Sequence, residues 1–399
     1  MKLHLSANQS ILNSSINISG SKSESNRLLI LQQLIDGLTI DNLSDSDDSN
    51  HLQHALSTVD ELVDIGHAGT AMRFLTAYFS VKEGREVVLT GSERMQNRPI
   101  GILVDALKDM GADISYEDKD GYPPLRIKGK RLVKETVQIN GNVSSQYISA
   151  LLLVASSLPN GLEIELLGEI TSIPYINMTL KLLRELGVEA GFNAQKIIVK
   201  PFKKSTSKEV TVESDWSSAS YFYSLVALSE IGTSVRLSAY KKDSLQGDSC
   251  LAEIYTHFGV GTEFKENTII LRKTREGDVD RRLKLNLKDA PDIAQTIAVT
   301  CFGLGLDCTL SGLHTLKIKE TDRLVALENE LTKLGADIHV TDTKLQLERG
   351  TNINSNIAIE TYNDHRMAMA FAPLALKVPI SILDANVVTK SYRNFWKDM

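Results

Sequence analysis

Six apolar, helix-like segments along the chain each open on a short run of polar residues. The apolar residues that follow each opening predict a helix. The six openings are Ser21-Lys22-Ser23, Gly69-Thr70, Ser144-Ser145-Gln146, Trp216-Ser217-Ser218, Asp292-Ile293-Ala294 and His365-Arg366. Their nearly constant spacing predicts one structural unit used six times.

A second set of helix-like segments, each ending in glycine, confirms the period of the pattern. The glycines are Gly111, Gly187, Gly259 and Gly335, and they lie 76, 72 and 76 residues apart. Glycine is common just past the end of a helix, because it adopts the left-handed conformation easily. A repeat of this length matches a small packed subdomain rather than one turn of a solenoid.

One unit shows the expected order of elements. Residues 149–158 predict an apolar helix, and residues 162–167 predict a short strand after the turn at Gly161. A second, amphipathic helix ends near Gly187, and residues 188–199 predict a two-strand hairpin. The chain therefore predicts an α/β (α+β) fold built from packed units.

Six units divide most simply into three plus three. At 399 residues and 42% hydrophobic composition, the chain is long enough for two domains. The proline, serine and lysine residues at 200–208 break the apolar pattern and predict a boundary near residue 210. We expect an N-terminal domain at 20–210 and a C-terminal domain at 211–399. Residues 1–19 predict a strand hairpin that fits either domain from its sequence, and we place it with the C-terminal domain.

Composition limits the possible partners. No stretch approaches the roughly 20 apolar residues that span a bilayer, and the N-terminus has no apolar signal region, so we expect a cytoplasmic protein. Cys250, Cys301 and Cys308 lack the spacing of metal ligands and fit a reducing compartment. The formal charge of −6 disfavours nucleic acid as a partner, so any anion site must come from a local cationic cluster.

The polar openings favour an anion site. Helix N-termini carry free backbone N–H groups and partial positive charge, so several of them together would attract anions. Serine, threonine and aspartate at one opening are explained equally well as helix caps. Cations near helix starts oppose the helix dipole and have no role in capping. Such cations are Lys22, Arg27, Arg73, Lys319, Arg323 and Arg366.

Five segments together resemble the 5-enolpyruvylshikimate-3-phosphate synthase family. They are Gly20 to Arg27, Ala68 to Arg73, Leu89 to Pro99, Lys319 to Leu324 and Asp364 to Met369. The resemblance runs in order from about residue 20 to 392. It implies two domains, each of three βαβαββ-type units, that close on substrates in the cleft between them.

The resemblance also implies a reaction. The enolpyruvyl group of phosphoenolpyruvate would pass to the 5-hydroxyl of shikimate 3-phosphate by addition and elimination, with release of phosphate. The implied partners are these two small molecules, with no organic cofactor and no metal, and we expect a monomer. Addition and elimination need acids and bases held beside many cations.

The site residues implied by the resemblance fall into three sets. The catalytic residues are Lys22, Asp292 and Glu320. Those for shikimate 3-phosphate are Lys22, Ser23, Arg27, Ser144, Ser145, Gln146, Ser172, Tyr175, Asp292 and Lys319. Those for phosphoenolpyruvate are Lys22, Gly69, Arg98, Gln146, Arg323, Arg366 and Lys390.

Each catalytic candidate also has a simpler interpretation. Asp292 and Glu320 are acids near helix starts, where acids stabilise the dipole. Lys22 could be a surface lysine, and the glycine spacing of a nucleotide-binding P-loop is missing upstream of it. Departures from the family pattern occur at His67, Phe74 and Thr315, and Arg393 replaces the proline of the closing element near Lys390.

Two other functions remain open from the sequence. The related transferase that acts on a UDP-amino sugar shares the fold and the donor but depends on a cysteine in a mobile loop. The corresponding segment, Arg94 to Arg98, has no cysteine. A binding protein without catalysis would lose its proton-transfer groups first, whereas Asp292 and Glu320 are both present.

Overall fold

The computed structural model describes residues 1–6, 13–170, 173–203, 207–277, 282–350 and 352–399. The contacts divide the chain into two compact units. We call Gly20–Val212 the N-terminal unit, and Met1–Ser19 with Glu213–Met399 the C-terminal unit. The expectation that these units act as two domains stays a prediction.

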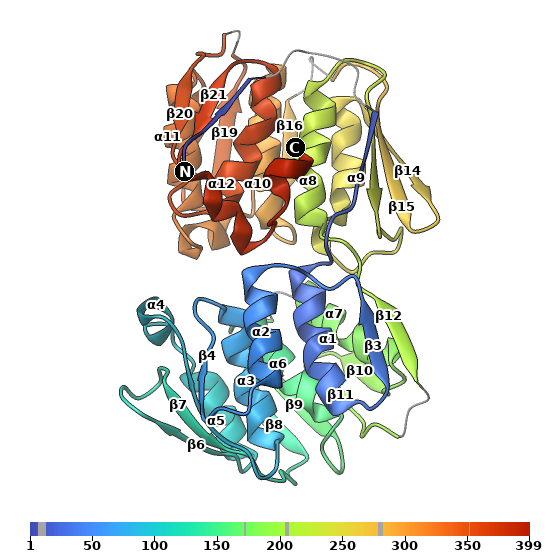
Figure 1. Cartoon of the computed structure of the whole chain (residues 1–399), viewed down its shortest axis with the longest axis vertical. Coiled ribbons are helices and arrows are strands. Elements are labelled where there is room, and N and C mark those ends of the chain that lie inside the picture. The colour runs from blue at the N-terminus through green and yellow to red at the C-terminus, as the bar shows by residue number, and fades with distance from the viewer. Residues whose placement is uncertain (7–12, 171–172, 204–206, 278–281, 351) are drawn as a thin grey trace. The chain divides into compact units, whose positions relative to one another are not determined.

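The N-terminal unit contains strands and helices in alternation (Figure 1). Its helices are α1 (Lys22–Leu34), α2 (Asp47–Ser57), α3 (Gly69–Val81), α4 (Glu93–Gln96), α5 (Gly101–Asp109), α6 (Ser145–Ala155) and α7 (Ile173–Glu185). Its strands are β3 (Leu38–Asp41), β4 (Leu62–Asp64), β5 (Glu86–Thr90), β6 (Asp113–Tyr116), β7 (Leu125–Lys128), β8 (Thr136–Asn140), β9 (Leu162–Leu167), β10 (Ala190–Asn193), β11 (Lys196–Val199) and β12 (Lys208–Thr211).

The C-terminal unit has the same alternation. Its α-helices are α8 (Trp216–Leu228), α9 (Leu251–Ile254), α10 (Ala294–Leu304), α11 (Arg323–Lys333), α12 (His365–Phe371) and α13 (Phe395–Asp398). Its 3₁₀ helices are η1 (Gly247–Cys250), η2 (Tyr255–Phe258), η3 (Pro291–Ile293), η4 (His314–Ile318), η5 (Ala372–Leu376) and η6 (Ala385–Lys390). Its strands are β1 (Leu3–Leu5), β2 (Asn13–Ile16), β13 (Ser234–Ser238), β14 (Val260–Lys265), β15 (Thr268–Lys273), β16 (Leu283–Asn286), β17 (Cys308–Ser311), β18 (Asp337–Val340), β19 (Lys344–Glu348), β20 (Ile357–Ile359) and β21 (Ile380–Ile382).

Four sheets share one strand order. They are β4-β5-β7-β6, β8-β9-β11-β10, β2-β13-β15-β14 and β16-β17-β19-β18. In each, the first two strands are parallel and the last two form an antiparallel hairpin. The two smaller sheets, β12-β3 and β1-β21-β20, each keep one parallel pair. Four sheets therefore confirm the repeated unit predicted from the sequence, and the two smaller sheets keep only its parallel pair.

The helices predicted at the six polar openings are also confirmed. They are α1, α3, α6, α8, α12, and α10 preceded by the short η3. The glycines that mark the second helices all have positive φ, at 101° for Gly111, 92° for Gly187, 77° for Gly259 and 98° for Gly335. A left-handed residue ends each helix without the cost of a Cβ clash.

Within each unit the helices that begin at polar openings pack together, and the sheets lie around them (Figure 1). In the N-terminal unit α3 contacts both α1 and α6, and in the C-terminal unit α10 contacts both α8 and α12. These helices are apolar on most sides because they are buried by sheets and by each other. Their N-terminal ends therefore carry the polar residues.

The N-terminal segment differs from its prediction. Residues 1–19 were expected to form a hairpin, but β1 pairs antiparallel with β21 and β2 pairs parallel with β13. Each strand completes a different sheet of the C-terminal unit, so the hairpin prediction is wrong. Strands of three and four residues gain more from joining an existing sheet than from pairing alone, since an isolated hairpin is marginal in water.

Helices long and apolar enough to cross a bilayer do not occur in the described parts of the chain.

Candidate active site

Asp292 lies at the centre of a charged cluster in the C-terminal unit. Its Oδ1 accepts a hydrogen bond from Arg323 Nη1 at 2.8 Å and is 3.5 Å from Lys319 Nζ. Its Oδ2 accepts from Arg366 Nη2 at 3.2 Å. Three cations therefore contact one carboxylate. An ionised carboxylate there can accept a proton from a bound hydroxyl group.

Arg323 connects Asp292 to two further acids. Its Nη2 donates to Glu320 Oε2 at 2.8 Å, and its Nε donates to Asp364 Oδ2 at 2.6 Å. Arg323 is 2% exposed and Asp364 is fully buried, whereas Glu320 is partly accessible. The arginine fork is thus oriented by acids on both sides.

Local helix chemistry places these side chains. Asp322 caps α11 by accepting from the N–H groups of Leu324 and Val325, both at 3.2 Å, which makes Arg323 the first residue of the helix. Asp364 caps α12 by accepting from Arg366 N–H at 2.8 Å. The two arginines therefore lie at helix N-termini, where the dipole opposes them, and the acids offset that cost.

Electrostatics keeps both arginines charged. Burial alone would lower the pKa of Arg323, but Asp364, Asp292 and Glu320 together raise it. Burial likewise opposes the charge of Arg366, and Asp292 leads the groups that raise its pKa well above the ordinary value. Cations held in this way at a helix start can bind phosphate or carboxylate.

Arg27 organises the first part of the N-terminal unit. It donates to Thr179 Oγ1 at 2.7 Å, to Ser23 O at 2.7 Å, to Ser149 Oγ at 3.1 Å and to Tyr175 O at 3.4 Å. Burial lowers its pKa to about 10, so it stays charged at neutral pH. The structure thus brings together three candidate residues for shikimate 3-phosphate: Ser23, Arg27 and Tyr175.

A second group of candidates meets near the start of α3. A Cβ placed on Gly69 would lie 2.3 Å from Arg98 Nη1, so the guanidinium rests directly on the glycine. Gln146 Nε2 donates to Thr70 Oγ1 at 3.2 Å, which joins the starts of α6 and α3. Ser144 caps α6 by accepting from Gln146 N–H at 3.4 Å, and Ser145 is buried at the first turn. The candidates Gly69, Arg98, Ser144, Ser145 and Gln146 are therefore neighbours.

The remaining predicted residues are more scattered. Lys22 Nζ is 4.0 Å from Asp48 Oδ2, and Lys390 Nζ donates to Asn363 O at 2.7 Å, next to Asp364. Ser172 lies outside the described residues. Of the departures from the family pattern, His67 contacts Ser92 Oγ at 2.8 Å. Thr315 lies in η4 and Arg393 is exposed.

Sequence reasoning missed Asp48 and Asp364 as members of these clusters. Both look like ordinary acids at helix starts, since Asp48 is in the first turn of α2 and Asp364 is the cap of α12. Asp364 performs both tasks, because its Oδ1 caps the helix and its Oδ2 binds Arg323. The available signal was that Asp364 opens the segment Asp364 to Met369, which carries part of the family resemblance.

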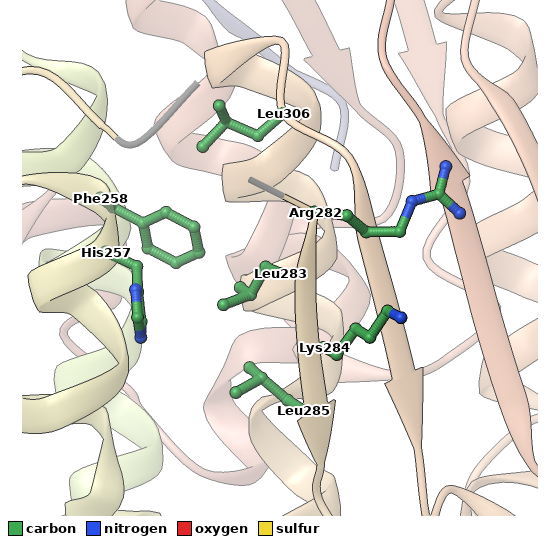
Figure 2. A pocket seen from close by; sticks show the side chains of 7 residues that line it. All are labelled: His257, Phe258, Arg282, Leu283, Lys284, Leu285 and Leu306. Atoms are coloured by element: carbon green, nitrogen blue, oxygen red, sulfur yellow. The ribbon is translucent and has the colours of Figure 1, made fainter. Parts of the chain in front are cut away.

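A separate pocket of about 430 Å³ lies in the C-terminal unit (Figure 2). Leu283 and Leu285 face Phe258 across it, whereas Arg282 and Lys284 point to the other side of β16. Arg282 instead pairs with Glu348. None of the candidate residues lines this pocket, so it is not part of the candidate site.

Within the described residues, His, Cys, Asp and Glu side chains form no group of three or more that could hold a metal ion.

Comparisons with known proteins show the family to which the chain belongs. The family model described as EPSP synthase (3-phosphoshikimate 1-carboxyvinyltransferase) matches residues 57–399. A 3-phosphoshikimate 1-carboxyvinyltransferase from Bacteroides fragilis (strain YCH46) is 46% identical over 404 residues, covering 100% of this chain and 97% of that protein. One from Haemophilus influenzae (strain Rd) is 37% identical, covering 98% of this chain and 96% of that protein.

Solved structures show the same fold. An EPSP synthase from Acinetobacter baumannii superposes with a TM-score of 0.83 at 21% identity, covering 99% of this chain and 96% of that one. An enolpyruvyl transferase from Streptomyces tendae gives a TM-score of 0.71 at 14% identity, covering 100% of this chain and 95% of that one. The predicted enolpyruvyl transferase fold is confirmed. Sequence and fold together show that the chain belongs to the EPSP synthase family.

Proposed function

We propose that this chain transfers the enolpyruvyl group of phosphoenolpyruvate to the 5-hydroxyl of shikimate 3-phosphate and releases inorganic phosphate. The observation that carries the proposal is the cluster of Asp292, Glu320, Lys319, Arg323 and Arg366 in a chain of this family. It combines two acids with three cations, which is what proton transfer beside a phosphorylated substrate needs.

The donor carries a phosphate and a carboxylate. Arg323 and Arg366 supply planar forks for these groups from the C-terminal unit, with Lys390 nearby. From the N-terminal unit, Arg98 over Gly69, together with Gln146 and Lys22, completes the proposed set. In the free protein the arginines are balanced by acids, and substrate anions would compete for the same N–H groups.

The acceptor would be held by hydroxyl groups and by cations. Ser23, Arg27 and Tyr175 lie together, and Ser144 and Ser145 open α6 with Gln146. Lys319 beside Asp292 is the proposed contact from the C-terminal unit. Ser172 completes the proposed set from the sequence alone.

The proposed chemistry is balanced. In the addition step the 5-oxygen bonds to C2 of phosphoenolpyruvate, the hydroxyl proton passes to Asp292, and a proton is delivered to C3. In the elimination step the C2–O bond to phosphate breaks, one proton of the C3 methyl group returns to the residue that delivered it, and the double bond forms again. The proton held by Asp292 then passes to the released phosphate. We assign the transfers at C3 and at the leaving phosphate to Glu320 and Lys22.

Product analysis tests this proposal. The protein is incubated with phosphoenolpyruvate and shikimate 3-phosphate, and mass spectrometry follows the enolpyruvyl adduct while a colorimetric assay follows phosphate. We expect one phosphate per adduct. Phosphate release without an adduct, or no reaction, contradicts the proposal.

We further propose that one chain is the active unit and that it works in the cytoplasm. All the residues proposed to bind the substrates are present in a single chain. Cys250, Cys301 and Cys308 are free thiols, as a reducing compartment would keep them. Light scattering after gel filtration should give a mass near 44.0 kDa for the active fraction. Activity confined to a heavier species contradicts the monomer.

A further inference from the structure

Arg73 is a buried cation that the proposed substrate sets leave unused. It lies on α3 one turn after Gly69 and is 4% exposed. Its Nη1 donates to Gly69 O at 3.0 Å and approaches Met95 Sδ at 3.7 Å, while its Nη2 donates to Pro99 O at 3.2 Å. The guanidinium therefore joins the start of α3 to the residue that follows Arg98.

Tyr147 provides a second connection to the same carbonyl. Its hydroxyl donates to Pro99 O at 2.7 Å, and its ring centroid lies 6.0 Å from Arg73 Cζ. Tyr147 follows Gln146, which itself contacts Thr70. Three segments that carry proposed phosphoenolpyruvate ligands thus meet around Arg73. They are the start of α3, the loop that holds Arg98 between α4 and α5, and the start of α6.

The geometry requires an arginine. The two terminal nitrogens of the Arg73 guanidinium donate to two carbonyl oxygens on different segments, those of Gly69 and Pro99. A lysine has a single ammonium nitrogen and cannot reproduce the spacing of these two donors. A buried cation is costly, and an apolar side chain of similar size often stabilises a core as well or better. Arg73 is bound by carbonyls, a sulfur and a ring, so its charge makes packing alone a poor explanation.

The charge of Arg73 and that of the neighbouring Arg98 also favour a role in anion binding. Burial, and after it the nearby Arg98, lower the pKa of Arg73 to about 10, so Arg73 stays charged at neutral pH. Two like charges held close together repel each other, and an anion bound at Arg98 would relieve that repulsion. The hydrogen bonds from Arg73 and Tyr147 to Pro99 O therefore hold Arg98 close to Arg73, where a bound anion would offset the repulsion between the two guanidinium groups.

We propose that Arg73 is a positioning residue for phosphoenolpyruvate: by holding the carbonyls of Gly69 and Pro99 it fixes the Arg98 guanidinium over Gly69. The inference rests on the proposed function. It assigns no contact between Arg73 and either substrate.

Steady-state kinetics of Arg73→Gln, Arg73→Lys and Tyr147→Phe, with both substrates varied, tests the inference. Losing a charged hydrogen bond costs roughly 1.5–3 kcal/mol, so Arg73→Gln should raise KM for phosphoenolpyruvate by about 10- to 100-fold. The KM of Arg73→Lys for phosphoenolpyruvate should lie between those of Arg73→Gln and the parent. Tyr147→Phe should raise this KM by about 3- to 10-fold. KM and the calorimetric Kd for shikimate 3-phosphate should stay within about twofold of the parent.

Arg85→Gln is the matched control. Arg85 also holds backbone carbonyls, donating to Val59 O at 2.6 Å and Thr58 O at 3.4 Å, but it belongs to another loop of the same unit. Its kinetic constants should equal those of the parent. If Arg73→Gln does not fold, the KM values of Arg73→Lys and Tyr147→Phe for phosphoenolpyruvate still test the positioning role of Arg73.

Two results would overturn the inference. One is an unchanged KM for phosphoenolpyruvate in the Arg73 and Tyr147 variants, and the other is an equal rise for both substrates together with a lower melting temperature. Failure of the proposed function is distinguishable, because the parent protein itself would then form no adduct.

Discussion

A single carboxylate, Asp292, is the residue on which the proposed chemistry depends. It is bound by Arg323 and Arg366 and lies 3.5 Å from Lys319. These neighbours are also the groups that would bind substrate anions. The same side chain can therefore hold the cations in place in the free protein and accept a proton during the reaction.

Asp292→Asn tests this role. The amide keeps the size and one acceptor oxygen but cannot take a proton at neutral pH, so kcat should fall by about 10²- to 10⁴-fold. Stopped assays of phosphate release with both substrates saturating give the value. Asp322→Asn is the control, because asparagine caps a helix as well as aspartate does. A kcat for Asp292→Asn within tenfold of the parent would remove Asp292 as the base.

Gly69→Ala tests the contact between Gly69 and Arg98. The added methyl would lie 2.3 Å from Arg98 Nη1, so the guanidinium must move away. KM for phosphoenolpyruvate should rise by about tenfold, while KM for shikimate 3-phosphate stays near that of the parent. Gly191→Ala is a matched control, since a Cβ there meets no atom within 4 Å. Equal Michaelis constants in parent and variant would refute the contact.

Asp248 should make stability depend on pH. Burial and then the Asp292 carboxylate raise its pKa from 3.8 to about 7. Between pH 4 and pH 7 the folded protein holds a proton that the unfolded chain releases, so this residue lowers the free energy of unfolding as pH rises. Asp248→Asn has no carboxyl group to titrate at this position. The free energy of unfolding of the variant minus that of the parent should therefore increase from pH 4 to pH 8.

Urea unfolding followed by tryptophan fluorescence measures this difference. Both tryptophans, Trp216 and Trp396, belong to the C-terminal unit, so the signal reports the unit that contains Asp248. Titration of other groups cancels when variant and parent are compared at each pH. A difference that is constant from pH 4 to pH 8 would show that Asp248 has an ordinary pKa.

At the scale of elements, helix starts carry both stability and the candidate site. Asp322 and Asp364 cap α11 and α12, and the next residues along each helix supply Arg323 and Arg366. A cap is a local feature, so the sequence predicts where a helix begins. Whether the capping acid also binds a distant arginine depends on tertiary packing, as it does for Asp364 and Arg323.

Alanine variants of the two caps separate these contributions. Asp322→Ala loses a cap and should lower the free energy of unfolding by about 1 kcal/mol. Asp364→Ala also leaves the buried Arg323 without its main acid, and should lower it by about 3–5 kcal/mol. Tryptophan fluorescence in urea again reports the C-terminal unit. Equal losses in the two variants would mean that the buried ion pair contributes little.

The same distinction explains which elements the sequence predicts. Helices at Ser145 and Trp216 and the hairpin within residues 188–199 follow from caps, apolar spacing and turn residues, all of them local. The pairing of β2 with β13 and of β12 with β3 joins residues far apart in sequence, and no local pattern specifies it. The candidate residues came from the resemblance, and their binding of substrates stays a prediction.

At the scale of the whole molecule, an acidic net charge coexists with local groups of cations. The chain carries a formal charge of −6, yet Arg27, Arg73 and Arg323 are buried and Arg366 is partly buried, all within the first two turns of their helices. The C-terminal unit is assembled from both ends of the chain, because β1 and β2 complete two of its sheets. Neither unit alone carries the full set of proposed ligands, so we expect activity to require the intact chain.

The most direct measurement is phosphate release from phosphoenolpyruvate with two acceptors compared side by side. The purified chain is assayed with shikimate 3-phosphate and, separately, with UDP-N-acetylglucosamine. We expect rapid release with shikimate 3-phosphate and none above background with the UDP-sugar. Release with the UDP-sugar, or none with shikimate 3-phosphate, would contradict it.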